Sequence, residues 1–109
     1  MENLQIIDEQ ALAEQRVVRS VVAHMLAAGY SATLNNGGDE NEITNSVSVD
    51  DVMALAGAVC EERIVFRKPG HKSGSILLVY GNAEDGSEVV ADYSTSLDEV
   101  PGFAALLDF

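Results

Sequence analysis

The sequence has few basic residues: six lysines and arginines stand against eighteen aspartates and glutamates, which gives a formal net charge of −12. Proteins that bind nucleic acid through its phosphates need clusters of lysine and arginine. The composition therefore argues against direct nucleic-acid binding. The simplest interpretation of the acidic excess is solubility, because like charges keep small proteins dispersed.

Cysteine, histidine and long apolar runs are also scarce. One cysteine excludes a disulfide framework, and the two histidines, His24 and His71, have none of the spacings typical of a zinc site. No wholly apolar run approaches the roughly 20 residues that span a bilayer. The first ten residues, MENLQIIDEQ, carry acids and lack the basic and apolar regions of a secretory signal. We therefore expect a cytoplasmic protein without membrane contact or bound metal.

Two glycine-containing segments, NNGGDEN at 35–41 and KPGHKSG at 68–74, lack the residue order of nucleotide-binding loops. Neither matches a calcium-binding loop, so we interpret both as turns and expect no cofactor. Nothing in the sequence supports a nucleophile pair of Cys60 with a histidine. No general acid and base can be named either, and we predict that the protein is not an enzyme.

The chain does have an apolar content and periodicity typical of a folded domain. Its 109 residues are 47% hydrophobic, which fits one domain over 1–109. Apolar residues over 8–28 recur at helical spacing, with Leu12, Val18, Val22 and Met25, or their neighbours on the same apolar stripe, expected on the buried side. Asp8 is suited to begin this helix, and Gly29 to follow its end.

Further elements follow from changes of period and from turn residues. Ser48 with Asp51 predicts the start of a second helix that ends near Cys60. The final segment predicts a third helix, which begins at Ser96 or at Pro101. Alternating apolar residues predict strands over 30–35, 42–47, 63–68, 75–81 and 88–93.

The segment 75–81, SILLVYG, is apolar on both alternating sides, which predicts a central strand covered on at least part of each face. An Asp-Gly turn predicts that 88–93 pairs with it antiparallel. The resulting class is α+β: two layers, a mainly antiparallel sheet of about five strands with helices on one face, in the order α-β-β-α-β-β-β-α.

The acids are grouped in stretches without any base, which predicts strongly negative faces. We take eight of them as candidate partner-binding residues: Asp39, Glu40, Glu42, Asp50, Asp51, Glu84, Asp85 and Glu88. Such faces suit a basic protein surface, including that of a nucleic-acid-binding protein.

Three short motifs, Val79–Asn82, Asp85–Gly86 and Val90–Leu97, form the pattern VYGN, a DG turn and VADYSTSL. This pattern resembles a family of small bacterial proteins that recur in phages and mobile elements. The likeness extends loosely to the first predicted helix, to Ala28–Gly37 and to the second predicted helix, and so spans most of the chain. The loop NAEDG is longer here than in the family pattern. The resemblance supports the architecture and carries over no catalytic or binding residue.

Together these observations predict a non-enzymatic, acidic protein-interaction module of phage or mobile-element type. One alternative is a DNA-mimicking inhibitor of a host nucleic-acid-binding enzyme, which would need rows of carboxylates spaced like phosphates. Another is a small enzyme or ligand-binding domain that uses Tyr80, Asn82 and Asp92, which would need a pocket with convergent polar groups.

Overall fold

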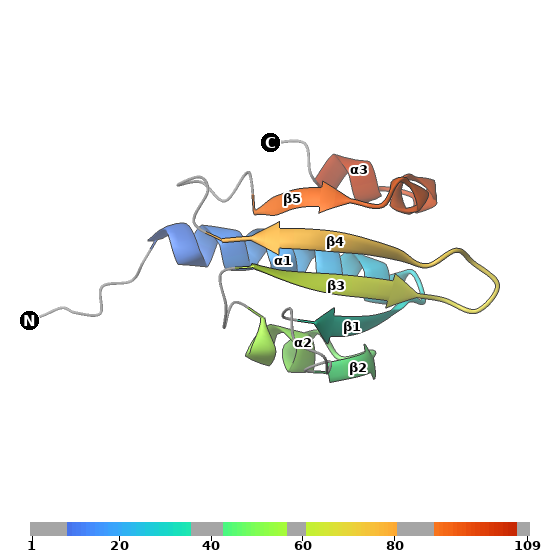
Figure 1. The fold of residues 1–109 in the computed structure, drawn as a ribbon, viewed down its shortest axis with the longest axis horizontal. Coiled ribbons are helices and arrows are strands. Elements are labelled where there is room, and N and C mark those ends of the chain that lie inside the picture. The colour runs from blue at the N-terminus through green and yellow to red at the C-terminus, as the bar shows by residue number, and fades with distance from the viewer. Residues whose placement is uncertain (1–8, 36–42, 57–60, 81–88, 107–109) are drawn as a thin grey trace, which may run out of the picture.

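The computed structural model of the chain describes residues 9–35, 43–56, 61–80 and 89–106. The chain has the predicted α+β class and the predicted order of elements. The elements, labelled in Figure 1, are α1 (Glu9–Ala27), β1 (Ser31–Asn35), β2 (Ile43–Ser46), α2 (Val49–Leu55), β3 (Glu61–Arg67), β4 (Gly74–Val79), β5 (Val90–Tyr93), the 3-10 helix η1 (Thr95–Glu99) and α3 (Phe103–Leu106).

The five strands form one antiparallel sheet in the order β2-β1-β3-β4-β5. One row of the register runs across four strands, through Leu34, Ile64, Ile76 and Tyr93. The strand β4 lies between β3 and β5, so the predicted central strand and its antiparallel pairing with β5 are confirmed. The Asp-Gly turn that was expected to join them lies outside the described residues.

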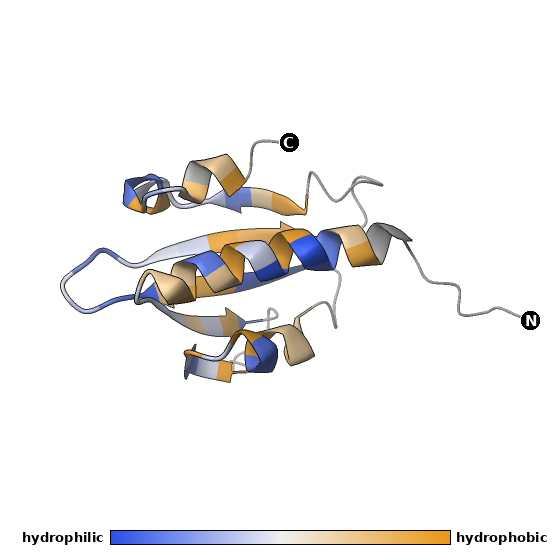
Figure 2. Ribbon diagram, turned by 180° about the vertical axis from the view of Figure 1, so that it is seen from behind, coloured by the Kyte–Doolittle hydropathy of each residue, from blue (hydrophilic) through white to orange (hydrophobic). Residues whose placement is uncertain are grey.

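The helix α1 lies across one face of the sheet, which we call the covered face (Figures 1 and 2). Its fully buried side chains are Val18, Val21, Val22 and Met25, close to the predicted set. The prediction for Leu12 is wrong, because this side chain is 38% exposed. A helix of 19 residues is about 28 Å long and the longest strand about 23 Å, so the first turns of α1 extend past the sheet.

The helix α2 begins where the sequence predicts and ends earlier. Ser48 Oγ accepts a hydrogen bond from the Asp51 backbone N–H at 3.2 Å, which caps the first turn. The helix ends at Leu55, and Ala56 is already extended with φ −67° and ψ 141°, so an end near Cys60 is wrong. So short a helix depends on tertiary packing, here through buried Val52. Cys60 itself lies outside the described residues.

The C-terminal segment matches neither predicted start of a single helix. A 3-10 turn precedes Pro101 and an α-helical turn begins at Phe103 after Gly102, whose φ is +85°. Val100, directly before Pro101, is extended, as the proline ring requires of its predecessor. Ser96 does not cap a helix; its hydroxyl donates to the Ser73 carbonyl at 3.2 Å. Within the described ranges, no helix is long and apolar enough to cross a membrane.

Candidate functional site: the open face of the sheet

The face of the sheet opposite α1 carries no helix in the described part of the chain (Figure 1). We call it the open face. Strand alternation and register assign to it the side chains of Ser31, Thr33, Asn35, Glu61, Arg63, Val65, Arg67, Ser75, Leu77, Val79 and Asp92.

Cross-strand pairing places unlike side chains next to one another on the open face. One row runs from Asn35 through Arg63 and Leu77 to Asp92, and so contains an amide, a cation, an apolar group and a carboxylate. Val65 lies opposite Ser75 in the adjacent row. The face therefore offers both charged and apolar contacts within a few strand spacings of one another.

Two arginines lie along the strands and cover their polar neighbours. Arg63 Nη1 donates to Ser75 Oγ at 3.0 Å, and Arg67 Nη1 donates to Thr33 Oγ1 at 3.3 Å. Thr33 is only 3% exposed, although its alternation with Ala32 and Leu34 predicts the solvent side. Besides Arg67, Asn45 on the edge strand β2 covers Thr33, because its backbone N–H donates to Thr33 Oγ1 at 3.0 Å.

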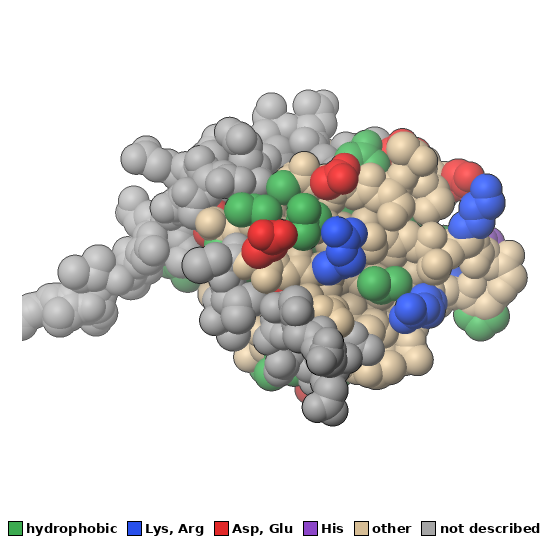
Figure 3. Space-filling view, in the orientation of Figure 1, with side chains coloured by type: hydrophobic (Ala, Val, Ile, Leu, Met, Phe, Trp, Pro, Cys, Tyr) green, Lys and Arg blue, Asp and Glu red, His purple; other side chains and the backbone are tan. Residues whose placement is uncertain are grey.

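An apolar group lies among these polar side chains. Val65, Leu77 and Val79 are each half-buried, and none of the described helices lies over them. Figure 3 views this face and shows apolar, basic and acidic side chains beside one another. The apolar character of β4 on both sides predicts partial cover on each face, and the half-buried state of Leu77 and Val79 agrees with it.

The described strands place no aromatic side chain on the open face. Phe66 belongs to the buried core, and Tyr93 packs edge-on against Phe103 with ring centroids 5.2 Å apart. Sheets that bind single-stranded nucleic acid use exposed aromatic rings on which bases stack. The described open face has arginines and small aliphatic groups instead.

Two of the eight predicted partner-binding acids lie within the described residues. Asp50 and Asp51 are exposed on the first turn of α2 and so do not belong to the open face. Asp50 Oδ1 accepts a hydrogen bond from Arg19 Nη2 at 2.7 Å, in an ion pair exposed to solvent. The other six acids lie in 36–42 and 81–88, outside the described ranges, and their role stays a prediction.

The basic residues are few in this chain of net charge −12, and two of the six lie on the open face: Arg63 and Arg67. This surface was not predicted as a binding site from the sequence, because the net charge directs attention to the acids. The signal was present in β3, where Arg63 and Arg67 alternate with the core residues Ile64 and Phe66.

The residues proposed for a small enzyme or ligand-binding domain are not brought together. The Tyr80 hydroxyl donates to the carboxylate of Glu62, a buried side chain on the covered face. Asp92 is exposed on the open face, where its Oδ1 accepts from the Tyr93 backbone N–H at 2.9 Å. Asn82 lies outside the described residues. The two described members of the set therefore belong to opposite faces of the sheet.

Histidine, cysteine and acidic side chains do not gather into a metal-binding group of three or more anywhere in the described ranges. His24 has a structural contact instead, because its Nε2 lies 2.7 Å from the Pro101 carbonyl oxygen and ties α1 to the C-terminal segment. Comparison with known proteins found no matching family model, curated protein or solved structure. The resemblance to the phage and mobile-element family therefore stays a prediction.

Proposed function

We propose that this protein is a non-enzymatic, cytoplasmic protein-interaction module that contacts its partner through the open face of the sheet. The observation that carries the proposal is the row Asn35, Arg63, Leu77 and Asp92, which combines apolar and charged groups on a face that the described helices leave open. Arginine is enriched in protein interfaces, where its planar group binds carboxylates and its methylenes pack on apolar surface.

The chemistry of the open face favours a partner with carboxylates around a small apolar centre. Arg63 and Arg67 each use one nitrogen in a hydrogen bond to the sheet, which leaves further N–H groups for a carboxylate. Val65, Leu77 and Val79 would be covered by the apolar centre. This contact is additional to the predicted one, in which the acidic segments bind a basic protein.

The size of the face favours a transient contact over a stable dimer. Seven residues along β3 and four strand spacings give a footprint of about 23 by 19 Å, or roughly 440 Å². Stable complexes usually bury about 800 Å² on each partner. A second copy of this chain bound through the open face alone would therefore associate weakly, and we favour a different protein as the partner.

A comparison of charge-reversed variants in a native lysate tests the proposal. Arg63→Glu with Arg67→Glu reverses the open face, and Arg16→Glu with Arg19→Glu makes the same charge change on α1. Proteins bound by the immobilised chain are compared by quantitative mass spectrometry. We expect the open-face variant to lose an acidic binding protein about tenfold or more, since truncating a close charge contact typically costs a few kcal/mol, and the α1 variant to retain it.

Each other outcome of this experiment has a definite meaning. Equal retention by both variants would contradict a role for the open face. Loss only with Asp50→Lys and Asp51→Lys would favour the acid-mediated contact with a basic protein instead. Light scattering adds one further check, because a wild-type dimer that the open-face variant dissociates would identify the partner as a second copy.

A further inference from the structure

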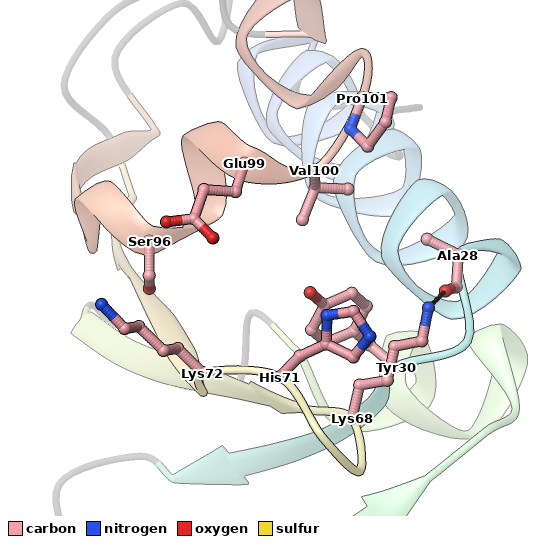
Figure 4. Close-up of a pocket in the computed structure, with 9 residues that line it drawn as sticks. All are labelled: Ala28, Tyr30, Lys68, His71, Lys72, Ser96, Glu99, Val100 and Pro101. Atoms are coloured by element: carbon pink, nitrogen blue, oxygen red, sulfur yellow. Dashed lines mark hydrogen bonds between the residues drawn. The ribbon is translucent and has the colours of Figure 1, made fainter.

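A cleft of about 350 Å³ lies outside the open face, where the end of α1, the loop between β3 and β4, and η1 meet (Figure 4). Its volume falls at the lower end of the range of about 300–1,000 Å³ that small-molecule sites occupy. Lys68, His71, Lys72, Ser96 and Glu99 contribute polar groups to its walls. Two of the six basic residues of this acidic chain thus line one small cavity.

Tyr30 forms the back of the cleft and is only 7% exposed. Figure 4 shows its hydroxyl directed into the cavity, and this hydroxyl makes no hydrogen bond to any described residue. The hydroxyl oxygen itself is reached by solvent in the cleft, because it is not among the buried polar atoms of the described residues that lack a partner. A ligand in the cleft would replace that water as its hydrogen-bond partner.

Lys68 is held in place beside the Tyr30 ring. Its Nζ donates to the Ala28 carbonyl at 2.7 Å and lies 5.6 Å from the centroid of the Tyr30 ring. An ammonium group has three protons, so two remain for a ligand. The His71 ring, 6.3 Å from the Tyr30 ring, lies at the same side of the cleft. These fixed contacts reduce the ordering that binding would otherwise require.

The opposite wall has a different character. Glu99 and Lys72 make no ion pair with any described residue, and Figure 4 shows both near Ser96, across the cavity from Lys68. The Glu99 carboxylate can accept a hydrogen bond from a hydroxyl or ammonium group of a ligand. The two walls therefore favour a molecule with an anionic end and a donor several atoms away.

We propose that this cleft binds a small carboxylate that also carries an amino or hydroxyl group. The carboxylate would accept hydrogen bonds from Lys68 and the Tyr30 hydroxyl, and the donor would face Glu99. This site is separate from the open face, so either proposal can fail without the other.

Two-dimensional NMR of the ¹⁵N-labelled full chain tests this site with three probes: 4-aminobutanoate, butanoate and inorganic phosphate. We expect the backbone amide signals of Tyr30, His71 and Lys72 to change chemical shift with 4-aminobutanoate and to reach saturation. The expected dissociation constant is about 1–10 mM for a ligand of this size. Butanoate, which lacks the donor, should bind several-fold more weakly. Saturable binding of phosphate alone would overturn the carboxylate class, and shifts that do not saturate would overturn the site.

Two matched pairs of variants separate the cleft from a general ionic effect. Tyr30→Phe keeps the ring and removes the hydroxyl. We expect it to lower the affinity for 4-aminobutanoate about tenfold, which is the effect of losing a hydrogen bond to a charged group. Tyr80→Phe makes the same chemical change beyond the far end of β4, away from the cleft, and should leave binding unaltered. Lys68→Gln removes the cation that faces the ligand carboxylate and should weaken binding, whereas Arg16→Gln, about 18 Å along α1 from Ala28, should not. Equal effects within either pair would contradict the proposal.

Discussion

The covered and open faces of the sheet are built from alternate residues of the same strands, and they differ in apolar burial and in charge. Ile64, Phe66, Ile76 and Leu78 are fully buried under α1. On the other side, arginines hydrogen-bond serine and threonine around half-buried aliphatic groups. The comparison indicates that stability is concentrated on one face, which leaves the side chains of the other available for contact.

The magnitudes support this division. Full burial of an aliphatic or aromatic side chain contributes about 1.5–3 kcal/mol, and the covered face has several of them. A hydrogen bond such as that from Arg63 to Ser75 contributes about 0.5–1.5 kcal/mol at most when it is open to water. Substitutions on the two faces should therefore differ strongly in their effect on unfolding.

The largest difference is expected for an aspartate introduced on each side. Val22→Asp places a charge without a partner between α1 and the sheet, and we expect the domain to unfold. Leu77→Asp places the same charge on the open face, where water can solvate it, and should leave a cooperative unfolding transition. Circular dichroism during heating measures both, and a folded Val22→Asp variant would contradict the assigned core.

A smaller effect is expected at Gly74, on the covered side of β4. A Cβ there would lie 2.6 Å from Leu97 Cδ2, and Leu97 is itself fully buried. Gly74→Ala should therefore cost about 1–3 kcal/mol by overpacking. Gly70, with φ +80° and no atom near its Cβ position, is the control.

Gly70→Asn should change the free energy of unfolding by only about 0.5 kcal/mol, because asparagine tolerates the left-handed conformation. Chemical denaturation of both variants measures the difference. If Gly74→Ala were as stable as Gly70→Asn, the close packing of η1 against β4 would be wrong.

On the open face, Arg67→Ala should cost at most about 1 kcal/mol, from the lost hydrogen bond to Thr33 and the lost cover of its side chain. Urea unfolding measures the change in the free energy of unfolding, with Arg16→Ala on α1 as the matched control. A loss several times larger would mean that the open face contributes to the core.

The smallest effect concerns Tyr93, which joins β5 to η1. Its hydroxyl donates to Asp98 at 3.2 Å, and this hydrogen bond, with the charge of Asp98 and some burial, raises the pKa of Tyr93 above the ordinary tyrosine value of about 10. A raised folded pKa favours the neutral form. The contribution to stability is therefore present below about pH 10 and lost as pH rises through the folded pKa.

Spectrophotometric titration of the three tyrosines should show one group that ionises later than in Asp98→Asn. Tyr93→Phe removes that late step and identifies it. If the titration of Asp98→Asn matched that of the wild type, the carboxylate would not control this phenol.

Much of the fold was predictable because the relevant signals are local. Val18, Val22 and Met25 recur at helical spacing, and Ala32 and Leu34 alternate at strand spacing, so burial could be assigned from period alone. The helix ends were less predictable. The early end of α2 at Leu55 and the 3-10 turn before Pro101 depend on how the chain returns to the sheet and on tertiary packing.

The candidate site could be predicted only in part. Alternation places Arg63 and Arg67 on one side of a strand, but it does not tell which side a helix will cover or which side chains will lie in the adjacent strand. Thr33 is buried by Asn45 and Arg67, twelve and 34 residues away along the chain. Such contacts arise from strand order, which local sequence does not specify.

The most direct test of the division between the two faces is the free energy of unfolding of Ile64→Ala and Val65→Ala, measured side by side. The two residues are neighbours on β3 and point to opposite faces. We expect Ile64→Ala to lose about 2–5 kcal/mol and Val65→Ala less than about 1 kcal/mol, because only the first leaves a cavity in the core. Equal losses would contradict the assignment of one face to stability and the other to contact.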